Sequence, residues 1–542
     1  MTDAHTARLC TRIIYSHFGS LASQVSSVLL ARGRLSLSQL VRYTSLRPRV
    51  IRASLLGLIQ HNLIWHSQGE HEDEEIVELN VEECLLRLRF GHFVWLAEKL
   101  LGPQAAEIIQ IVLDHGKLQP PEILSKIVSS NSEAYILYVQ ALLQLVVTAH
   151  LKPSTTLCHL SPQDKLIKYE AEEKAKIPGL PSAKALREAK EAAEARVKLE
   201  EHELTKVGLK QAAMGKRTIH RSQKRQAEEV DEVDDAVFFR VNPEKFNIHI
   251  RNALIEKAST ERYNEGAARV LRAVLSVTQP RQLKLSDVRS DPISVASVVM
   301  QLADEEGAAT GLIFGSKKVP QTTWIKEYLG ILSSSDNPTP AGKEASFVTF
   351  GSSKVQVEFE VIGRRLRRRI LESVTRERYG KEGLRVLRLL LDAGKLDEKQ
   401  ISKAVMMAPK DVRPLLAAMT ADFLVSTQEI AKSSDRNPAR TFYLWYVDSK
   451  KAYSIILGQF YKTLYNICMR MQSEEEQGDV RAVLEKTERS DVRQDESLLT
   501  RLERDILAEW RLKQEKLIIM QLRVDEAVFV LRDLSVYGAD QD

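Results

Sequence analysis

The chain has 542 residues, of which 44% are hydrophobic and 28% are charged, with a formal net charge of +5. This length and composition predict roughly three to five domains, each able to bury a core. The mildly positive charge argues against a protein that coats nucleic acid. The four cysteines lack metal-site spacing, so we expect them to be reduced, structural and intracellular. We expect no signal peptide and no transmembrane run.

The first 81 residues predict a helix, a short strand, two more helices and a β-hairpin. Gly33 ends the first helix where a left-handed residue is needed, and Ser36 can cap a helix over Ser38–Thr44. Pro48 stands in the first turn of the third helix, where its missing N–H costs nothing. The hairpin strands are expected at Leu63–Trp65 and Ile76–Val81. This order is that of a winged helix.

The same unit occurs again further along the chain. Residues Gly19–Ile64 align without a gap on Gly380–Val425, an offset of 361 residues, with eleven identities in 46 positions. Two weaker copies begin near Gly102–Leu118 and Glu261–Leu275. Each copy follows another helix, joined at Gly19, Gly102, Asn264 or Gly380, residue types that tolerate the left-handed conformation. Repetition of this kind fixes the domain organisation.

The predicted fold is therefore mainly α-helical with small β-wings. We expect four tandem extended winged helices, at residues 1–81, 82–164, 236–346 and 347–447. Residues 165–235 are a charged linker, partly helical or disordered, in which Lys216-Arg217 and Lys224-Arg225 form a weak nuclear-import signal. The loop at 333–346 is expected to be mobile. Residues 448–542 contain two amphipathic stretches, Ala452–Met471 and Leu498–Leu534, which predict a helical hairpin or coiled coil.

No catalytic constellation is present in the sequence. The stretch Ala341-Gly342-Lys343-Glu344 lacks the Ser or Thr of a phosphate-binding loop, and no paired Cys motif or HExxH motif occurs. His17 and His61 lie near apolar faces and are expected to be structural. We therefore predict neither an enzyme, nor a cofactor, nor a metal site.

The third helix of each copy is the place to look for nucleic-acid contacts. The first copy has four arginines on or beside it, although the carboxylates of its wing (residues 69–75) would repel phosphates: Arg42, Arg47, Arg49 and Arg52. The third helix of the second copy, expected at Asn131–Val147, has no basic residue. That of the third copy, expected at Asp291–Glu306, is acidic at both ends. The fourth copy has Lys410 and Arg413, offset by Asp411.

The densest basic cluster precedes the fourth copy and consists of Arg364, Arg365, Arg367, Arg368 and Arg369. With Leu366 and Ile370 on the inner side, these arginines are expected on the outer faces of one helix. Two interpretations stay open. The cluster is either a solvated face that pairs with Glu372 and nearby acids, or a patch near a nucleic-acid backbone or an acidic partner.

The chain resembles the large subunit of the RNA polymerase III-specific heterotrimer, a family related to the large subunit of general transcription factor IIE. The resemblance is carried by residues 9–64, by the Glu-Arg-Tyr repeats at Glu261 and Glu377, and by the Phe-Tyr-Leu-Trp-Tyr-Val strand at Phe442–Val447. It implies a non-catalytic nuclear subunit at the polymerase clamp, bound to two partner subunits. Such a subunit would help recruit the enzyme through initiation factor IIIB and open promoter DNA for transfer RNA, 5S ribosomal RNA and other small RNAs.

Three other classes remain as alternatives. A stand-alone transcription factor needs a basic third helix and a basic wing in the same copy, which no copy has. A helical-repeat scaffold with one winged helix conflicts with the 361-residue offset, although a winged-helix scaffold of another nuclear complex does not. An enzyme is the third alternative, but the sequence contains no catalytic motif. We expect DNA binding by the chain to be weak and largely independent of sequence, and we expect no membrane contact.

Overall fold

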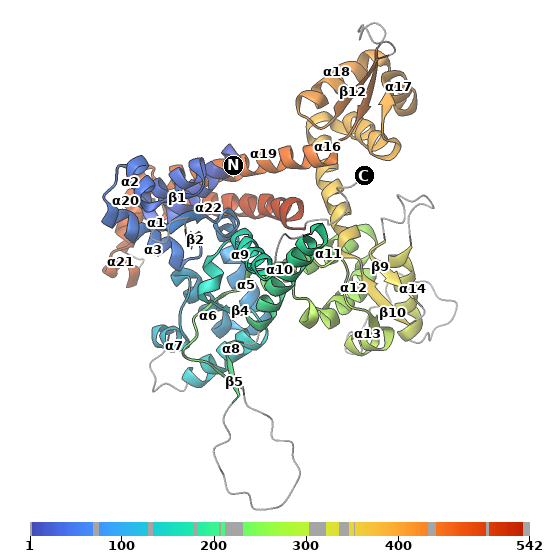
Figure 1. Cartoon of the computed structure of the whole chain (residues 1–542). Helices are drawn as coiled ribbons and strands as arrows, with labels where there is room; N and C mark the ends of the chain where they lie inside the picture. Colours follow the sequence, from blue (N-terminus) through green and yellow to red (C-terminus); the bar gives the residue numbers. More distant parts are fainter. Residues whose placement is uncertain are drawn as a thin grey trace, which may run out of the picture. The chain divides into compact units, whose positions relative to one another are not determined.

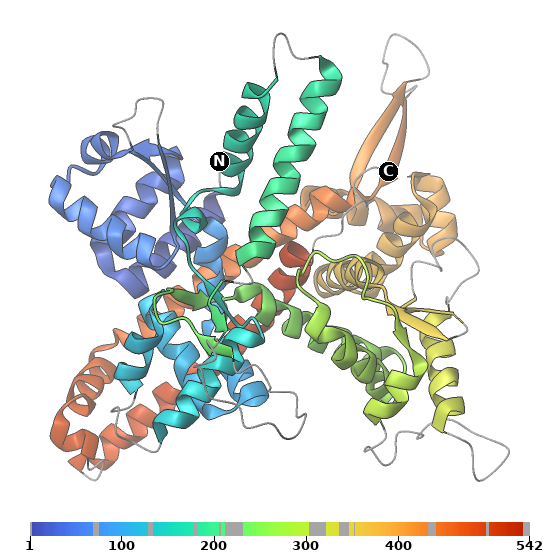
Figure 2. The ribbon, with the colours of Figure 1, turned by 60° about the horizontal axis from the view of Figure 1, so that its bottom comes forward.

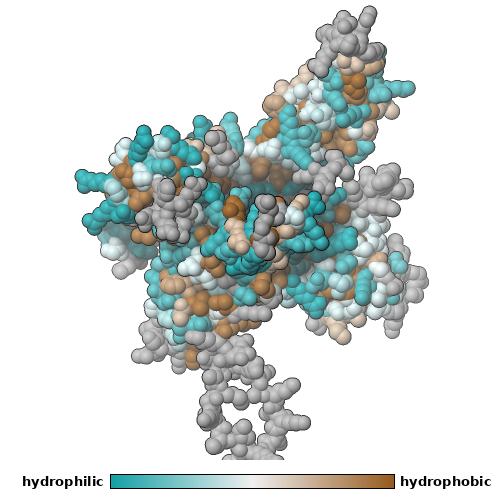
Figure 3. All heavy atoms as spheres, in the orientation of Figure 1, coloured by the Kyte–Doolittle hydropathy of each residue, from teal (hydrophilic) through white to brown (hydrophobic). Residues whose placement is uncertain are grey.

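The computed structural model describes residues 3–68, 75–127, 134–177, 182–204, 207–211, 231–302, 321–334, 346–351, 353–431, 441–494 and 498–534. The chain forms two compact units, Met1–Phe246 and Asn247–Asp542. Figure 1 labels helices and strands of both units. No helix in the described part is long and apolar enough to cross a membrane. On the face shown in Figure 3, hydrophobic and hydrophilic residues are interspersed.

The first module has the predicted order of elements. It contains α1 (Ala4–Arg32), β1 (Leu35–Ser36), α2 (Leu37–Thr44), α3 (Pro48–Gln60), β2 (Ile64–Gln68) and β3 (Glu75–Leu79). The strands form a sheet in the order β1-β3-β2. The predicted cap is confirmed, because Ser36 accepts a hydrogen bond from the Gln39 N–H and the Gln39 side chain accepts one from Ser36. Both wing strands begin within one residue of the prediction, but β2 ends three residues later and β3 two residues earlier than expected.

The fourth module repeats the backbone of the first. It contains α16 (Phe359–Ala393), β11 (Leu396–Asp397), α17 (Glu398–Val405), α18 (Pro409–Ala421), β12 (Ser426–Ala431) and β13 (Thr441–Tyr446), with sheet order β11-β13-β12. Positive φ angles recur at the 361-residue offset: Gly19 and Gly380 (82° and 66°), Gly33 and Gly394 (82° and 77°), Ser45 and Met406 (57° each), Asn62 and Phe423 (58° and 57°). The turn geometry is therefore kept even where the side chain changes.

The second module has a wing whose two strands are far apart in the sequence. The module contains α4 (Val81–Leu86), η1 (Arg87–Arg89), α5 (Phe90–Leu101), α6 (Pro103–His115), α7 (Pro120–Ile127), α8 (Ala134–Val147), β4 (Leu151–Pro153) and β7 (Phe239–Val241). Strand β4 pairs with β7, and Leu118 bridges to Phe239. The expected domain boundary at residue 236 was therefore wrong. Residues 165–235, which were expected to link two domains, stand in the sequence between the two wing strands of one module. A wing tolerates such an insertion because only its strands must pair.

The insertion begins with η2 (Thr156–His159) and continues as two antiparallel helices, α9 (Pro162–Ala175) and α10 (Ala183–Leu204), which stand out as a pair in Figure 2. Two short strands, β5 (Leu209–Gln211) and β6 (Asp231–Val233), follow. The helices pack closely because Ala189 and Ala193 of α10 are small and buried. Glu200 ties them together by accepting bonds from Lys165 (3.0 Å) and the Tyr169 hydroxyl (2.6 Å). The two basic pairs of the predicted import signal lie outside the described residues.

The third module departs most from the prediction. It contains α11 (Pro243–Arg262), α12 (Glu265–Thr278), η3 (Gln279–Arg281), β8 (Ile293–Ser294), α13 (Val295–Leu302), α14 (Gln321–Ser333), β9 (Val348–Phe350) and β10 (Lys354–Val357). The predicted third helix, Asp291–Glu306, was wrong: α13 stands second and α14 third. Asn264 is also not left-handed. It is extended (φ −158°) and caps α12 by accepting a hydrogen bond from the Ala267 N–H.

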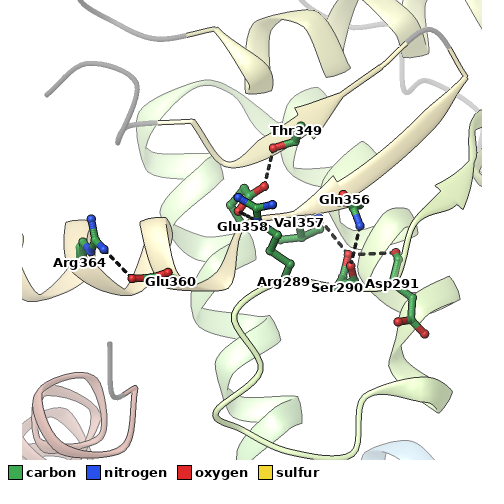
Figure 4. A network of polar contacts seen from close by, with 9 residues as sticks. All are labelled: Arg289, Ser290, Asp291, Thr349, Gln356, Val357, Glu358, Glu360 and Arg364. Atoms are coloured by element: carbon green, nitrogen blue, oxygen red, sulfur yellow. Dashed lines mark hydrogen bonds and ion pairs between the residues drawn. The ribbon is translucent and has the colours of Figure 1, made fainter. Parts of the chain in front are cut away.

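A polar network joins the sheet of the third module to the start of α16 (Figure 4). Glu358, almost fully buried, accepts hydrogen bonds from Arg289 (2.8 Å) and from the Thr349 hydroxyl (2.5 Å). The Ser290 hydroxyl accepts one from the Val357 N–H (2.9 Å). Losing the Arg289 contact is costly because it leaves the buried carboxylate of Glu358 without a compensating charge. The network therefore fixes where α16 begins.

The C-terminal helices partly match the prediction. They are α19 (Ser449–Glu475), α20 (Gly478–Thr487), α21 (Ser490–Gln494), α22 (Arg501–Val528) and the π-helical turn η6 (Phe529–Asp533). Helices α19 and α22 pack against each other. Within the amphipathic stretch predicted at Leu498–Leu534, Leu531 and Leu534 are buried beyond the end of α22, whereas Met520 on α22 is 45% exposed. Leu531 joins the core of the fourth module together with Ala452 and Ile456 of α19.

The first two modules meet at a close backbone contact. A Cβ added to Gly116, which has a φ of 83°, would lie 2.4 Å from the carbonyl oxygen of Gln60. The Gln60 amide also donates to the carbonyls of His115 (3.2 Å) and Lys117 (2.7 Å). The end of α3 is therefore held against the turn that follows α6.

We expect Gly116→Ala to destabilise the chain by roughly 2–5 kcal/mol, because it combines a left-handed alanine with a backbone clash. The matched control is Gly33→Ala, which has nearly the same φ (82°) but nothing within 4 Å of the added Cβ. The control should cost only about 1–2 kcal/mol. Urea unfolding would measure both, and equal destabilisation of the two variants would contradict the clash.

His61 at this contact predicts a pH dependence of stability. Its pKa is lowered to about 4, first by burial and then by Arg87, whose positive charge is close. Because an unfolded histidine has a pKa near 6.5, the unfolded chain binds more protons between pH 6.5 and 4. The stability contribution is complete above pH 6.5 and is lost as the pH falls towards 4. The thermal midpoint should therefore fall less between pH 7.5 and 5 in His61→Gln than in the parent chain, and identical slopes would refute this assignment.

Candidate nucleic-acid interface

Four of the predicted site residues lie together on the α2–α3 face of the first module. Arg47 is the N-cap residue of α3, and Arg49 and Arg52 follow on that helix. The buried residues Ile51, Leu55 and Leu58 turn one side of α3 to the core, so the arginines occupy the opposite side. Arg42, at the end of α2, completes the set. All four arginines lie at least partly open to solvent.

The charges of these four arginines are not paired with carboxylates in the described part of the chain. None of the four forms an ion pair with a carboxylate within the described residues. Sequence reasoning missed a fifth basic group: the Arg32 guanidinium lies 3.9 Å from the centroid of the Tyr43 ring, which is 40% exposed. No helical spacing relates these two residues, because they belong to different helices. The wing carboxylates at positions 70 and 72–74 lie outside the described residues.

The arginine cluster on α16 is arranged differently. Arg364 pairs with Glu360 (2.5 Å), Arg368 with Glu372 (3.1 Å) and Asp392 (2.9 Å), and Arg369 with Glu261. The Arg367 Nε donates to the Val530 carbonyl (3.3 Å), and Arg365 lies over the Phe347 ring (5.5 Å). Arg369 is more than half exposed, whereas the other four arginines are half-buried, so the cluster is less open than the expected outer faces. The interpretation as a face that pairs with Glu372 and nearby acids matches these contacts.

The electrostatics of Arg368 follow from these contacts. Burial lowers the pKa of Arg368, but its hydrogen bonds to Asp392 and Glu372 outweigh burial and raise the pKa above its usual value. Glu372 also accepts two hydrogen bonds from Arg388, at 2.6 and 3.0 Å. A phosphate would have to compete with these carboxylates for the same guanidinium groups.

The third helices of the other modules present little positive charge. In α18, Arg413 pairs with Glu398 (2.6 Å), while Lys410 has no ion pair among the described residues. Helix α8 contains no charged residue and exposes Ile136 (63%) and Leu137 (54%). Helix α14 exposes one lysine and one glutamate, which offset each other.

The chemistry available on the α2–α3 face is that of anion binding. Exposed guanidinium groups can bind the phosphate oxygens of DNA. Such contacts to the DNA backbone position a duplex without reading its sequence. In the described part of the chain, no group of three or more His, Cys, Asp or Glu side chains is arranged to hold a metal ion. Among the predicted residues, this face is where unpaired cations gather.

Comparisons with known proteins place this arrangement in a family. Three family models match separate segments: the RNA polymerase III subunit RPC82 helix-turn-helix domain at residues 8–68, RNA polymerase III subunit RPC82 at 140–324, and the POLR3C C-terminal winged-helix domain at 371–447. Together they cover more than half of the chain.

Full-length relatives agree with these matches. DNA-directed RNA polymerase III subunit rpc3 of Aspergillus niger is 25% identical, over 98% of this chain and 100% of the relative. The subunit of the same name from Emericella nidulans is 26% identical over the same shares. DNA-directed RNA polymerase III subunit RPC3 of Danio rerio is 23% identical, over 97% of this chain and 98% of the relative. The chain belongs to the RNA polymerase III subunit RPC82 family, and its full-length relatives are named as RNA polymerase III subunit RPC3.

Proposed function

We propose that this chain is a non-catalytic subunit of nuclear DNA-directed RNA polymerase III that acts as a series of docking modules. The observation that carries the proposal is the unequal charge of the third helices. Only α3 presents several arginines without an intramolecular partner in the described residues, whereas α8 is uncharged and α18 neutralises Arg413. We propose RNA polymerase III as the complex because the relatives are named as subunits of that enzyme.

In this proposal the four modules are tandem extended winged helices, and α19 with α22 is a coiled coil. The recurrence of left-handed residues at matching positions in the first, second and fourth modules supports the tandem arrangement. The modules dock with the two heterotrimer partners on the clamp of the largest subunit. They assist recruitment by initiation factor IIIB and the opening of promoter DNA, for transcription of transfer RNA, 5S ribosomal RNA and other small RNAs.

DNA contact, in the same proposal, is made by the α2–α3 face and is largely independent of sequence. The partner-free arginines there suit the phosphate backbone, and the paired arginines of α16 make a smaller contribution. A stand-alone sequence-specific transcription factor is the alternative. It would need both third helix and wing of one module to be basic, and the wing of the first module is rich in Glu.

The first test reverses charge at equivalent positions. Arg52 and Arg413 correspond at the 361-residue offset, but only Arg413 is paired with a carboxylate. We expect Arg52→Glu to weaken duplex DNA binding by the full chain at low salt, and Arg413→Glu to change it little. Adding Arg47→Glu and Arg49→Glu should make the slope of log K against log salt shallower by about 0.9 for each phosphate that the variant no longer neutralises.

Fluorescence anisotropy with unrelated duplexes of equal length would measure these affinities. Equal weakening by Arg52→Glu and Arg413→Glu would remove the α2–α3 face as the DNA-binding surface. A tight footprint that depends on sequence would favour the stand-alone factor.

The second test concerns the assembly. Affinity purification of the tagged chain from cells, followed by mass spectrometry, should recover the subunits of a complete RNA polymerase III. The Arg47, Arg49 and Arg52 substitutions should leave that recovery unchanged, because they lie on the proposed DNA face. Recovery of the chain without polymerase subunits would reject the proposed function.

A further inference from the structure

A row of three cations crosses the sheet of the second module. Lys152 of β4 pairs with Arg240 of β7. Leu118 and Phe239 form an antiparallel bridge, so Lys117, one residue earlier, faces Arg240 from the other side. Cross-strand partners point to the same face of a sheet. The three side chains therefore stand in line on segments spaced about 4.8 Å apart.

The other modules show that this row is not a requirement of the fold. The corresponding residues are Arg34, Glu78 and Trp65 in the first module, Gln356 and Thr349 in the third, and Lys395, Tyr446 and Ser426 in the fourth. In the first module the positions hold an ion pair of 2.8 Å, and in the fourth the lysine lies over a tyrosine ring at 5.3 Å. The second module alone places a cation at every position of the row.

This cation row has no paired carboxylate in the described part of the chain. Lys117, Lys152 and Arg240 form no ion pair with a described carboxylate. Beside the row, the Nε of Arg240, the hydroxyl of Ser154 and the Nδ1 of His159 are buried without a hydrogen-bond partner. Unsatisfied buried polar atoms are rare in native proteins and call for a specific explanation.

The local electrostatics show the same imbalance. The pKa of Lys152 is lowered to about 8, first by burial and then by Arg240, although Glu83, Glu244 and Cys158 act in the opposite direction. The pKa of His159 is lowered to about 4 by burial and then by Lys117, whose Nζ lies 2.7 Å from its Nε2. Like charges directly opposite each other destabilise a sheet, so an anion on the row would relieve the repulsion.

We propose that the cation row of the second module binds the carboxylates of an extended acidic peptide segment from another protein. Side chains two residues apart in an extended peptide lie about 6.6 Å apart on one face, which places two carboxylates along a row of about 10 Å. A carboxylate is narrow enough to reach half-buried guanidinium and hydroxyl groups and can bind arginine through both oxygens. A duplex carries its phosphates on a convex surface, which suits exposed arginines such as those of α3 instead.

The source of the acidic segment is another polymerase subunit, and this part alone rests on the proposed function. Phe238 lies next to Ser154 in the strand register and is 42% exposed, so it offers a ring for an apolar residue of the segment. A nucleobase can stack on the same ring. Single-stranded DNA is therefore the competing ligand in the test.

The test uses the full chain and a fluorescein-labelled twelve-residue peptide in which glutamate alternates with serine. We expect the double variant Lys117→Gln, Lys152→Gln to bind this peptide at least tenfold more weakly than the parent chain. The matched control is Lys395→Gln, which changes the equivalent of Lys117 in the fourth module and should leave binding unchanged. The thermal midpoint of the double variant should equal or exceed that of the parent chain, since the variant removes like charges from the sheet.

Three outcomes would overturn the proposal. The first is equal peptide binding by the double variant and the parent chain. The second is binding of a twelve-nucleotide single strand, but not of the peptide, that disappears in the double variant. The third is peptide binding that appears only when Glu70, Glu72, Asp73 and Glu74 are changed to amides. That result would mean that the chain's own carboxylates, not those of a partner, bind the row in the parent chain. None of these results affects the recovery of polymerase subunits, so failure here is distinguishable from failure of the proposed function.

Discussion

The constraint on which the first, second and fourth modules depend is the left-handed backbone at fixed places in each of these three. A left-handed residue ends α1 at Gly33, another ends α2 at Ser45, and a third follows α3 at Asn62, and the fourth module has its equivalents at the same offset. Each such residue reverses the chain over a few atoms, so that three helices and a hairpin can share one core. Ser45, Asn62, Met406 and Phe423 adopt this conformation although it costs about 1–2 kcal/mol for an ordinary side chain. The packing of the surrounding helices must supply that energy.

Because the turns and the core define the module, its surfaces are free to differ. The same third-helix position carries exposed arginines in α3, no charge in α8 and a neutralised arginine in α18. The same row across the sheet holds an ion pair in the first module and three cations in the second. The repeated fold therefore sets where a surface lies, and individual residues set what it can bind.

The sequence predicted what local chemistry controls. Three local features could be predicted from the sequence, because each depends on residues within four positions: the cap at Ser36, the turn at Gly33 and the start of α3 at Pro48. The third helix of the third module could not be predicted in this way. Helices α13 and α14 are separated by a long stretch of sequence, so the local pattern does not show that α13 is the second helix and α14 the third. The partners of the α16 arginines include Glu261 and the carbonyl of Val530, which come from distant parts of the chain. No periodicity could have indicated those contacts. The cation row likewise depends on a strand register that joins residues 117, 152 and 240.

The discontinuous wing of the second module has a consequence for how the chain folds during synthesis. Strand β4 ends at Pro153 and its partner β7 begins at Phe239, so 85 residues lie between them. Translation at 5–20 residues per second needs roughly 4–17 seconds to make that stretch. Helices α4 to α8 must wait for this time with one side of their sheet unformed, and contacts so distant in sequence form slowly. The nascent chain therefore exposes an unpaired strand edge on the ribosome, which makes this interval the one in which a chaperone or a partner subunit can engage it.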